Sequence, residues 1–291
     1  MKIRFAVSMG LGAPDPDHMA AVVTEAEGQG FDSLWFSDIT LLPGTDPFLA
    51  VTFASTHSKR MKLGVNLVPF GYEPFVFARQ VAQLDRLVNG RLLITLVPGL
   101  DRPGERAALG IAGRHRGRML DALIPDLRTW WAGGQVAVGE DQEPIALPVL
   151  PAQDELEIWL GGQGPDAVQR AGRFSDGWLG SIVSPERAGA IREEIQAVAA
   201  EAGRTIDPEH FGLSVGYARE PGDLDKMIRL RRPKGQDVTP VVPVGGPELR
   251  DMIQRLIDNG LSKFVVRRVA PVESWPSELA WLADTILDLQ T

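Results

Sequence analysis

A glycine-rich stretch between a strand and a helix is the strongest candidate for ligand chemistry in this sequence. Residues 157–167 read E-I-W-L-G-G-Q-G-P-D-A, which places Gly161, Gly162 and Gly164 between a short apolar run and a helix whose first turn contains Pro165. Backbone amides at a helix N-terminus can bind a phosphate when side chains do not crowd them. A tight glycine turn without a ligand explains the same residues equally well. A Rossmann dinucleotide site is disfavoured, because no acidic residue closes a strand–helix–strand unit at the expected distance.

Metal chelation and nucleophilic catalysis find little support in the remaining residues. The chain has four histidines and no cysteine, so thiolate chemistry, disulfides and cysteine-type zinc sites are excluded. The histidines lie far apart without chelating spacings, and no G-x-S-x-G motif is present for an acyl nucleophile. We therefore expect no metal site. His115 follows a long loop in G-R-H-R-G, where a surface role is favoured over a catalytic one.

The elements that position these residues alternate between short strands and amphipathic helices. Eight such alternations in 291 residues predict an α/β fold, a (β/α)8 TIM barrel, over a doubly wound open sheet, which alternates in the same way. Chemistry in such a barrel lies in the loops after the carboxyl ends of the strands. The expected strands are residues 3–7, 33–36, 62–67, 92–97, 157–160, 177–181, 212–217 and 263–266.

Two segments interrupt the alternation. Residues 133–155 contain Gly, Pro and alternating apolar residues, which predicts an inserted hairpin or excursion, and residues 221–244 are irregular. Neither resembles a linker between domains. We expect one barrel domain over residues 1–291 with inserted segments.

The charge balance disfavours nucleic acid as a partner. The chain carries 30 Lys and Arg against 38 Asp and Glu, a formal charge of −8, whereas phosphate backbones require a basic face. A basic cluster of Arg229, Arg231, Arg232 and Lys234 is interpreted as a solvated loop. No signal peptide follows the N-terminus, and no apolar stretch approaches the roughly 20 residues that a bilayer requires. We expect a cytoplasmic protein without a membrane partner.

Four stretches in this order resemble the luciferase-like superfamily, especially its coenzyme F420-dependent branch. They are E-A-E-G-Q-G-F-D-S-L-W-F-S-D at 25–38, L-G-V-N-L-V-P-F-G-Y at 63–72, F-A-R-Q-V-A-Q-L-D-R-L-V-N-G-R-L at 77–92, and the glycine loop followed by A-G-R-F-S-D-G-W at 171–178. The resemblance spans roughly residues 1–185. The rest of the chain is included because its predicted strands complete the eight that the barrel requires.

The resemblance implies a barrel that binds coenzyme F420, or alternatively flavin mononucleotide (FMN), at its carboxyl end and passes hydride through the ring. It also implies a non-prolyl cis peptide between Asn66 and Leu67, which would form a ledge behind the ring and would cost about 3 kcal/mol. Carried over by position, Asp38 contacts the polar edge of the ring. The other positions implied for the cofactor are Asn66, Leu67 and Pro69 behind the ring, Pro98 and Gly99 beside it, and Gly162, Gln163, Gly164, Asp166 and Ala167 at the phosphate.

Departures from the family pattern argue against a sugar-phosphate substrate. Ile39 replaces the histidine that follows the aspartate in the family's glucose-6-phosphate dehydrogenases, Leu100 replaces an acidic residue, and Ser184 replaces a phosphate-binding lysine. A mostly apolar small organic substrate is expected instead. The expected substrate pocket contains Ile39, Leu41, Leu42, Phe70, Leu100 and Ser181, with Tyr72 beside it.

The resulting hypothesis is an F420-dependent oxidoreductase in which solvent, Tyr72, Glu105 or His115 handles the proton. An FMN-dependent monooxygenase and a barrel that binds the coenzyme without turnover remain open. The family resemblance also implies a homodimer, for which the apolar residues 75–87 are suitable.

Overall fold

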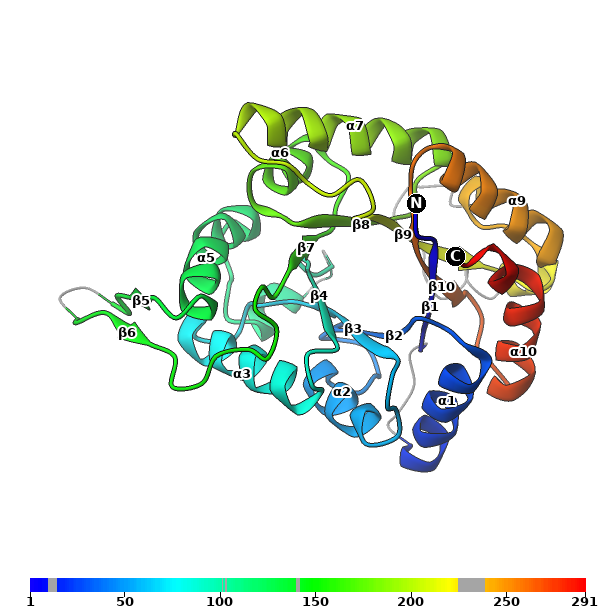
Figure 1. Ribbon diagram of the computed structural model, residues 1–291, viewed down its shortest axis with the longest axis horizontal. Helices are drawn as coiled ribbons and strands as arrows, with labels where there is room; N and C mark the ends of the chain where they lie inside the picture. Colours follow the sequence, from blue (N-terminus) through cyan, green and yellow to red (C-terminus); the bar gives the residue numbers. More distant parts are fainter. Residues whose placement is uncertain (10–14, 101, 103, 140–141, 225–238) are drawn as a thin grey trace.

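The computed structural model is a closed barrel of eight parallel strands surrounded by helices (Figure 1). It describes residues 1–9, 15–100, 102, 104–139, 142–224 and 239–291. Around the barrel the order is β1-β10-β9-β8-β7-β4-β3-β2. The barrel strands are β1 (Arg4–Ser8), β2 (Ser33–Ser37), β3 (Lys62–Leu67), β4 (Leu92–Leu96), β7 (Ile158–Leu160), β8 (Gly177–Ser181), β9 (Phe211–Tyr217) and β10 (Lys263–Arg268).

The predicted TIM barrel is therefore confirmed over the open sheet. The decisive contact is the pairing of β1 with β10, which closes the sheet and leaves no edge strand. All eight predicted strands are present, with boundaries that differ by at most two residues.

Helices follow the strands and pack on the outside of the barrel. Several begin with a proline in the first turn, where its missing N–H removes no hydrogen bond. Asp15 and Asp46 cap α1 and α2 by accepting bonds from backbone amides. The helices are α1 (Pro16–Gln29), α2 (Pro47–Ser55), α3 (Pro74–Leu87), α4 (Glu105–Ala108), α5 (Arg116–Trp131), α6 (Pro165–Phe174), α7 (Pro185–Glu201), α9 (Gly245–Asp258) and α10 (Trp275–Ile286), with 3-10 turns η1 (Thr239–Val241) and η2 (Leu287–Leu289).

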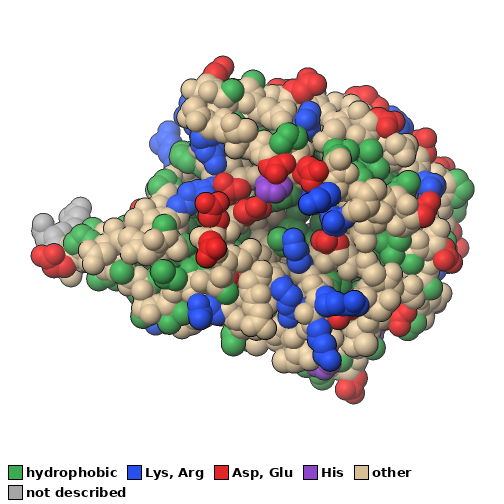
Figure 2. Space-filling model, in the orientation of Figure 1, with side chains coloured by type: hydrophobic (Ala, Val, Ile, Leu, Met, Phe, Trp, Pro, Cys, Tyr) green, Lys and Arg blue, Asp and Glu red, His purple; other side chains and the backbone are tan. Residues whose placement is uncertain are grey.

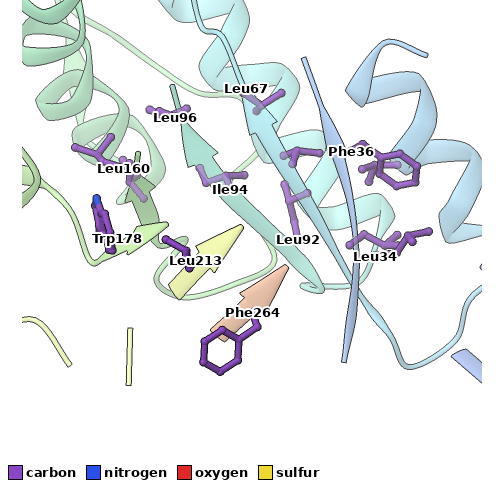
Figure 3. Packing of buried hydrophobic residues seen from close by; sticks show 14 of the residues in the cluster. Leu34, Phe36, Leu67, Leu92, Ile94, Leu96, Leu160, Trp178, Leu213 and Phe264 are labelled. Carbon is purple, nitrogen blue, oxygen red and sulfur yellow. The ribbon is translucent and has the colours of Figure 1, made fainter. Parts of the chain in front are cut away.

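The main core lies between the strands and the helices. Alternate strand residues point outward and pack there as one large hydrophobic cluster. Figure 3 shows part of it, including Leu34 and Phe36 from β2, Leu67 from β3 and Ile94 from β4. These side chains fix the strand register, because a one-residue slip would turn them toward the barrel axis.

A second cluster fills the inside of the barrel. Six strands contribute its members, which are Ala6, Trp35, Leu93, Trp159, Leu179 and Val265. The tryptophans fit because the neighbouring strands carry glycine beside them. A Cβ at Gly64 would lie 2.2 Å from Trp35, and one at Gly177 would lie 2.4 Å from Trp159.

The expected insertion is a two-stranded antiparallel hairpin, β5 (Gln135–Val136) with β6 (Ile145–Ala146), that projects from the barrel (Figure 1). Its return segment is held by Asp85 of α3. The buried Asp85 carboxylate accepts bonds from the amides of Ala152 at 2.8 Å and Gln153 at 2.9 Å, and from the Gln153 side chain at 2.7 Å. A single carboxylate thus anchors the insertion to the barrel wall.

The amino ends of the strands carry paired charges. Arg4 of β1 lies 3.2 Å from Asp32, and Asp176, just before β8, lies 2.8 Å from Arg128. Figure 2 shows acidic, basic and histidine side chains gathered at the centre of the face where Figure 1 marks the N-terminus. Within the residues described, no helix is long and apolar enough to cross a membrane. The basic cluster Arg229, Arg231, Arg232 and Lys234 lies outside the described residues.

Candidate active site

The inward side chains become polar toward the carboxyl end of the barrel. Side chains alternate between the two faces of a strand. The residue two positions after each member of the inner cluster therefore also faces the barrel axis, one layer closer to the carboxyl end. Gly64 lies opposite Trp35 in the register, and Gly212 lies opposite Leu179, so the rule extends to β3 and β9. The layer contains Ser8, Ser37, Asn66, Thr95, Gly161, Ser181, Ser214 and Arg267.

Asp38 stands directly above this layer at the end of β2. Its backbone N–H donates to the Asn66 carbonyl at 2.9 Å, and its Oδ2 accepts a 3.3 Å bond from the Val68 amide. Burial raises the pKa of Asp38 from 3.8 to about 6; the Val68 bond opposes this shift, whereas the charges of Asp46 and Glu105 add to it. A carboxyl group with this pKa can hold or release a proton near neutral pH.

Glu105, the first residue of α4, is buried next to this group with only 1% of its surface exposed. Its Oε1 accepts a 3.2 Å bond from the Leu100 amide, while its Oε2 is buried without a partner among the described residues. Gly99 permits this approach, because a Cβ there would lie 3.1 Å from Oε1. Two carboxyl groups, Asp38 and Glu105, therefore face the same region of the barrel mouth.

Arg116 shapes the loop that covers Glu105. Its Nη1 donates to the carbonyl oxygens of Pro98 at 2.9 Å, Gly99 at 3.2 Å and Leu100 at 3.0 Å. Three carbonyls around one guanidinium fix the loop after β4, so the predicted contacts Pro98 and Gly99 are held in a defined conformation.

The peptide bond between Asn66 and Leu67 is trans, and no cis bond occurs in the described part of the chain, so the expected cis peptide is wrong. The ladder between β3 and β4 stays regular through Leu67 and Leu96, and the Val97 amide continues it by donating to the Leu67 carbonyl at 2.9 Å. Asn66 faces the mouth and donates from Nδ2 to Ser37 Oγ at 3.0 Å. The Leu67 side chain is fully buried in the outer core.

The glycine-rich loop is open, as expected for an anion seat. Gly162, Gln163, Gly164 and Asp166 are all exposed, and Gly164 begins α6 without a side-chain cap. Gly162 has a positive φ of 106°, and a Cβ there would lie 2.7 Å from the Ala167 methyl group. Its carbonyl accepts a 2.8 Å bond from the Trp178 indole, which fixes the loop against β8. The space above Gly164 is clear, because no neighbouring atom lies within 4 Å of the position that a Cβ would occupy there.

The other proposed proton donors are less favourably placed than Glu105. His115 is exposed and caps α5, where its Nδ1 accepts a 3.3 Å bond from the Arg118 amide. The Tyr72 ring is half-buried between Phe48 and Phe77, with ring centroids 6.0 Å and 5.8 Å away. Burial raises the pKa of Tyr72, and the charges of Asp46 and Asp38 add to this shift, so the phenol keeps its proton at neutral pH.

The expected apolar pocket divides into two groups. Phe70 and Pro69 are buried beneath the mouth, and Phe70 belongs to the outer core. Leu41 and Leu100 are each 43% exposed on loops after β2 and β4. Ile39 and Leu42 are half-buried in the turn that the Leu42 amide closes on the Ile39 carbonyl at 3.0 Å, and Ser181 is exposed at the end of β8.

Two residues at the mouth were not predicted from the sequence. Thr95 is buried, faces the axis from β4, and its Oγ1 has no partner among the described residues. Arg267 faces the axis from β10, 3.6 Å from a Cβ position at Gly216. Strand alternation, extended one layer past the apolar residues, would have identified both.

Comparisons with known proteins identify the family and agree with the barrel fold. A family described as luciferase-like monooxygenase matches residues 1–220. A 5,10-methylenetetrahydromethanopterin reductase of Methanolobus tindarius is 27% identical over 227 residues, which cover 77% of this chain and 67% of that protein. A putative coenzyme F420-dependent oxidoreductase of Mycobacterium tuberculosis is 26% identical and covers 69% of this chain, which spans 62% of its length. An F420-dependent secondary alcohol dehydrogenase, solved with an F420–acetone adduct, superimposes over 100% of both chains with a TM-score of 0.79 at 18% identity.

Proposed function

Because the chain belongs to the luciferase-like monooxygenase family, we propose that it is an oxidoreductase that uses coenzyme F420 to transfer hydride to or from a small, largely apolar organic substrate. The observation that carries the proposal is the pairing, on one barrel rim, of an exposed helix start at Gly164 that has no side-chain cap with an Asp38 carboxyl whose pKa is raised to about 6. The names of two relatives that share 26% and 28% identity, a putative coenzyme F420-dependent oxidoreductase and an F420-dependent hydroxymycolic acid dehydrogenase, favour F420 over FMN.

The residues present fit such a coenzyme. The uncapped start of α6 at Gly162, Gln163 and Gly164 would hold the phosphate, with the exposed Asp166 directed to solvent. The Ala167 amide, also expected there, donates instead to the Gly164 carbonyl at 2.9 Å. Asp38 and Asn66 would hydrogen-bond the ring, and the fixed loop at Pro98 and Gly99 would lie beside it. When bound, the deazaflavin supplies the hydride chemistry, and the protein supplies position and electrostatics.

Glu105 is the best-placed group for moving a proton. It is buried beside Asp38, and one of its oxygens is not bonded within the described residues. We expect Glu105→Gln to lower kcat by about a hundredfold, within the range for general acid–base groups. His115→Ala should leave kcat within about twofold, because His115 is an exposed helix cap. Unchanged turnover in Glu105→Gln, Tyr72→Phe and His115→Ala would leave Asp38 or solvent as the source of the proton.

Equilibrium titration with F420 and with FMN, read by fluorescence and thermal shift, tests the cofactor. Gly164→Glu should weaken F420 binding more than tenfold, because it adds a negative charge at the helix start without a steric clash. Gly28→Glu is the matched control, since Gly28 also has open space around it and lies on α1. Wild-type protein that binds neither ring system would refute the proposal.

Two alternatives give different results in the same experiments. Tight binding of FMN in place of F420 would favour a monooxygenase, which is the activity that the family description names. A protein that binds reduced F420 but does not bleach it in a single turnover with ketones or aldehydes would be a binding barrel.

We further propose that two copies pair through the outer faces of α2 and α3. The proposal rests on the resemblance to the family; Leu49 and Leu87 are 67% and 63% exposed there, although single exposed apolar side chains are common on protein surfaces. Light scattering measures the mass directly, and a monomer at micromolar concentration would rule the pairing out.

A further inference from the structure

The inserted segment of residues 133–155, the arm, carries a concentration of exposed apolar side chains. Ten large apolar residues are exposed in the described part of the chain, and four of them lie on the arm: Val138, Ile145, Val149 and Leu150, which are 36%, 39%, 37% and 41% exposed. Single exposed apolar residues are ordinary on a protein surface, but several on one projecting segment are typical of a contact surface. Figure 2 shows hydrophobic side chains along this projection.

The strand pairing shows that the barrel covers the apolar face of the arm only at its base. Val136 lies opposite Ile145 in the antiparallel register, so the two side chains share one face of the hairpin. Val136 and Leu147 pack in the outer core, whereas Ile145 stays exposed. The Trp130 indole fixes the same region by donating to the Ile145 carbonyl at 2.9 Å. The face is therefore held in place at its base and open to solvent farther out.

The arm and the neighbouring helix α3 carry opposite charges. Residues 133–155 contain five Asp and Glu and no Lys, Arg or His. On α3 the only carboxylate is buried. Beyond its first turn, the exposed residues of α3 have the spacing of a single helical face, and they are Arg79, Gln83, Arg86 and Leu87. We call these four residues the α3 face, which is basic and partly apolar.

The arm and the α3 face adjoin each other on one surface. Arg86 Nη1 lies 3.5 Å from the carbonyl oxygen of Leu150, one of the exposed apolar residues of the arm. An acidic apolar projection and a basic apolar helix therefore lie side by side. A surface that contains both halves of a contact is complementary to itself, as a two-fold pair of identical chains requires. The charge of the arm disfavours nucleic acid and anionic membranes as alternatives.

We propose that the arm of each copy lies across the α3 face of a second copy, so that two identical contacts hold a closed dimer. Each contact would cover Val138 and Ile145 and would bring the carboxylates of the arm toward Arg79 and Arg86 of the other copy. The inference goes beyond the pairing through α2 and α3, because it assigns the inserted arm as the segment that holds the copies together. It depends neither on the coenzyme nor on the reaction.

Sedimentation velocity of the full-length protein over a range of concentrations measures the dimer. Wild type should form a dimer, and a chain with both Val138→Ser and Ile145→Ser should raise the dimer Kd at least about tenfold, because two apolar side chains are no longer buried. Ile182→Ser is the matched control and should keep Kd within about twofold, since Ile182 is 43% exposed but follows β8, three strands from β3. Unchanged circular dichroism spectra would show that the variants fold.

Charge reversal tests the α3 face. Arg79→Glu should raise the dimer Kd about fivefold at low salt, because it places a carboxylate against an acidic arm, and the difference should shrink as salt is added. Arg173→Glu makes the same change in net charge at an exposed position of α6. Its dimer Kd should stay within about twofold of wild type.

A fluorescent label reports directly whether the arm is covered. The chain has no cysteine, so Ile145→Cys and Ile182→Cys each accept a single acrylodan label. Emission from the label at position 145 should shift to the blue as the concentration rises through the dimer Kd, because the label enters an apolar contact. The label at position 182 should not respond.

Two results would overturn the role of the arm and leave the pairing through α2 and α3 standing. They are a dimer Kd unchanged by Val138→Ser with Ile145→Ser, and a dimer that forms without a shift of the label at position 145. Wild type that is monomeric at about 100 µM would refute both forms of pairing, and assemblies that grow beyond two copies would refute the closed arrangement. Titration with F420 and FMN tests the oxidoreductase separately, since its failure in a protein with an arm-dependent dimer would refute only the proposed reaction.

Discussion

Buried carboxylates at the two ends of the barrel differ in how many hydrogen bonds they accept from the protein. Asp85, near the amino end, is fully buried and accepts bonds from three nitrogen atoms of Ala152 and Gln153. Glu105, near the carboxyl end, is equally buried but accepts one bond, from the Leu100 amide. The first carboxylate is satisfied by the fold itself, whereas the second keeps an oxygen for which the described residues supply no partner.

The pKa values show the same contrast. Glu27, at the end of α1, accepts bonds from the amides of Lys59, Arg60 and Met61. Burial raises its pKa, but these bonds outweigh that effect and lower the pKa from 4.5 to about 2. At the carboxyl end, burial raises the pKa of Asp38 to about 6. The negative charge of Glu27 is stabilised by hydrogen bonds that hold elements of the fold together. The negative charge of Asp38 remains energetically costly, and a bound ligand would compensate that cost.

Removing Asp85 should have the largest effect on stability. Asp85→Ala removes the hydrogen bonds that the nitrogens of Ala152 and Gln153 donate to a fully buried carboxylate, so we expect unfolding free energy to fall by about 3 kcal/mol. Denaturant titration measures this loss. Asp154→Ala is the control, because Asp154 is exposed on the same segment and should change stability by less than about 0.5 kcal/mol. Equal effects of the two variants would show that Asp85 does not anchor the segment.

Glu27 should give an acid-dependent effect of intermediate size. Its pKa is lower in the folded chain than the ordinary 4.5, so its contribution is full above pH 4.5 and is lost as the pH falls toward 2. After allowance for solvent screening we expect about 1–2 kcal/mol. Unfolding curves of wild type and Glu27→Gln should therefore converge as the pH is lowered from 5 to 2. Curves that stay parallel over this range would contradict the assigned pKa, and Glu25→Gln on the same helix should follow the wild type.

Asp38 should show the smallest effect on stability and the opposite sign. Because its pKa is higher in the folded state, the unfolded chain releases the proton first and stability falls as pH rises from about 4 to about 6. Asp38→Asn removes this penalty and should raise stability by about 1 kcal/mol at pH 7, after discounting for partial exposure. The difference should vanish near pH 3, and F420 affinity should fall. If Asp38→Asn were less stable than wild type at pH 7, the proposed difference between the carboxylates at the two ends of the barrel would be contradicted.

The barrel was predictable because strand and helix periodicities are local. The strands Lys62–Leu67 and Gly177–Ser181 have the predicted boundaries, since apolar runs and flanking turn residues mark both ends. The end of β10 was missed by two residues. Arg268 there pairs with the buried Asp223 and Glu278 at 3.0 Å, and these partners are distant in sequence.

The sequence predicted which residues lie at the site better than it predicted their conformation. The family pattern located Asp38 and the glycine loop, and the structure places both at the carboxyl end of the barrel. The prediction of a cis bond was wrong. Asn66 and Leu67 pair regularly with β4, and this pairing depends on a neighbouring strand that the local sequence does not show. The burial of Glu105 and the positive φ of Ile182 depend on how loops pack, which no local residue pattern reports.

Trp35 and Trp159 give the barrel a solid floor. Seated against Gly64 and Gly177, they occupy the interior between the charged amino end and the polar layer. The barrel is therefore filled below its polar layer and is not a channel, so a small molecule at the carboxyl end must enter and leave from that end. If a coloured coenzyme binds above these two indoles, as proposed, it would quench their emission, and tryptophan fluorescence would report its binding.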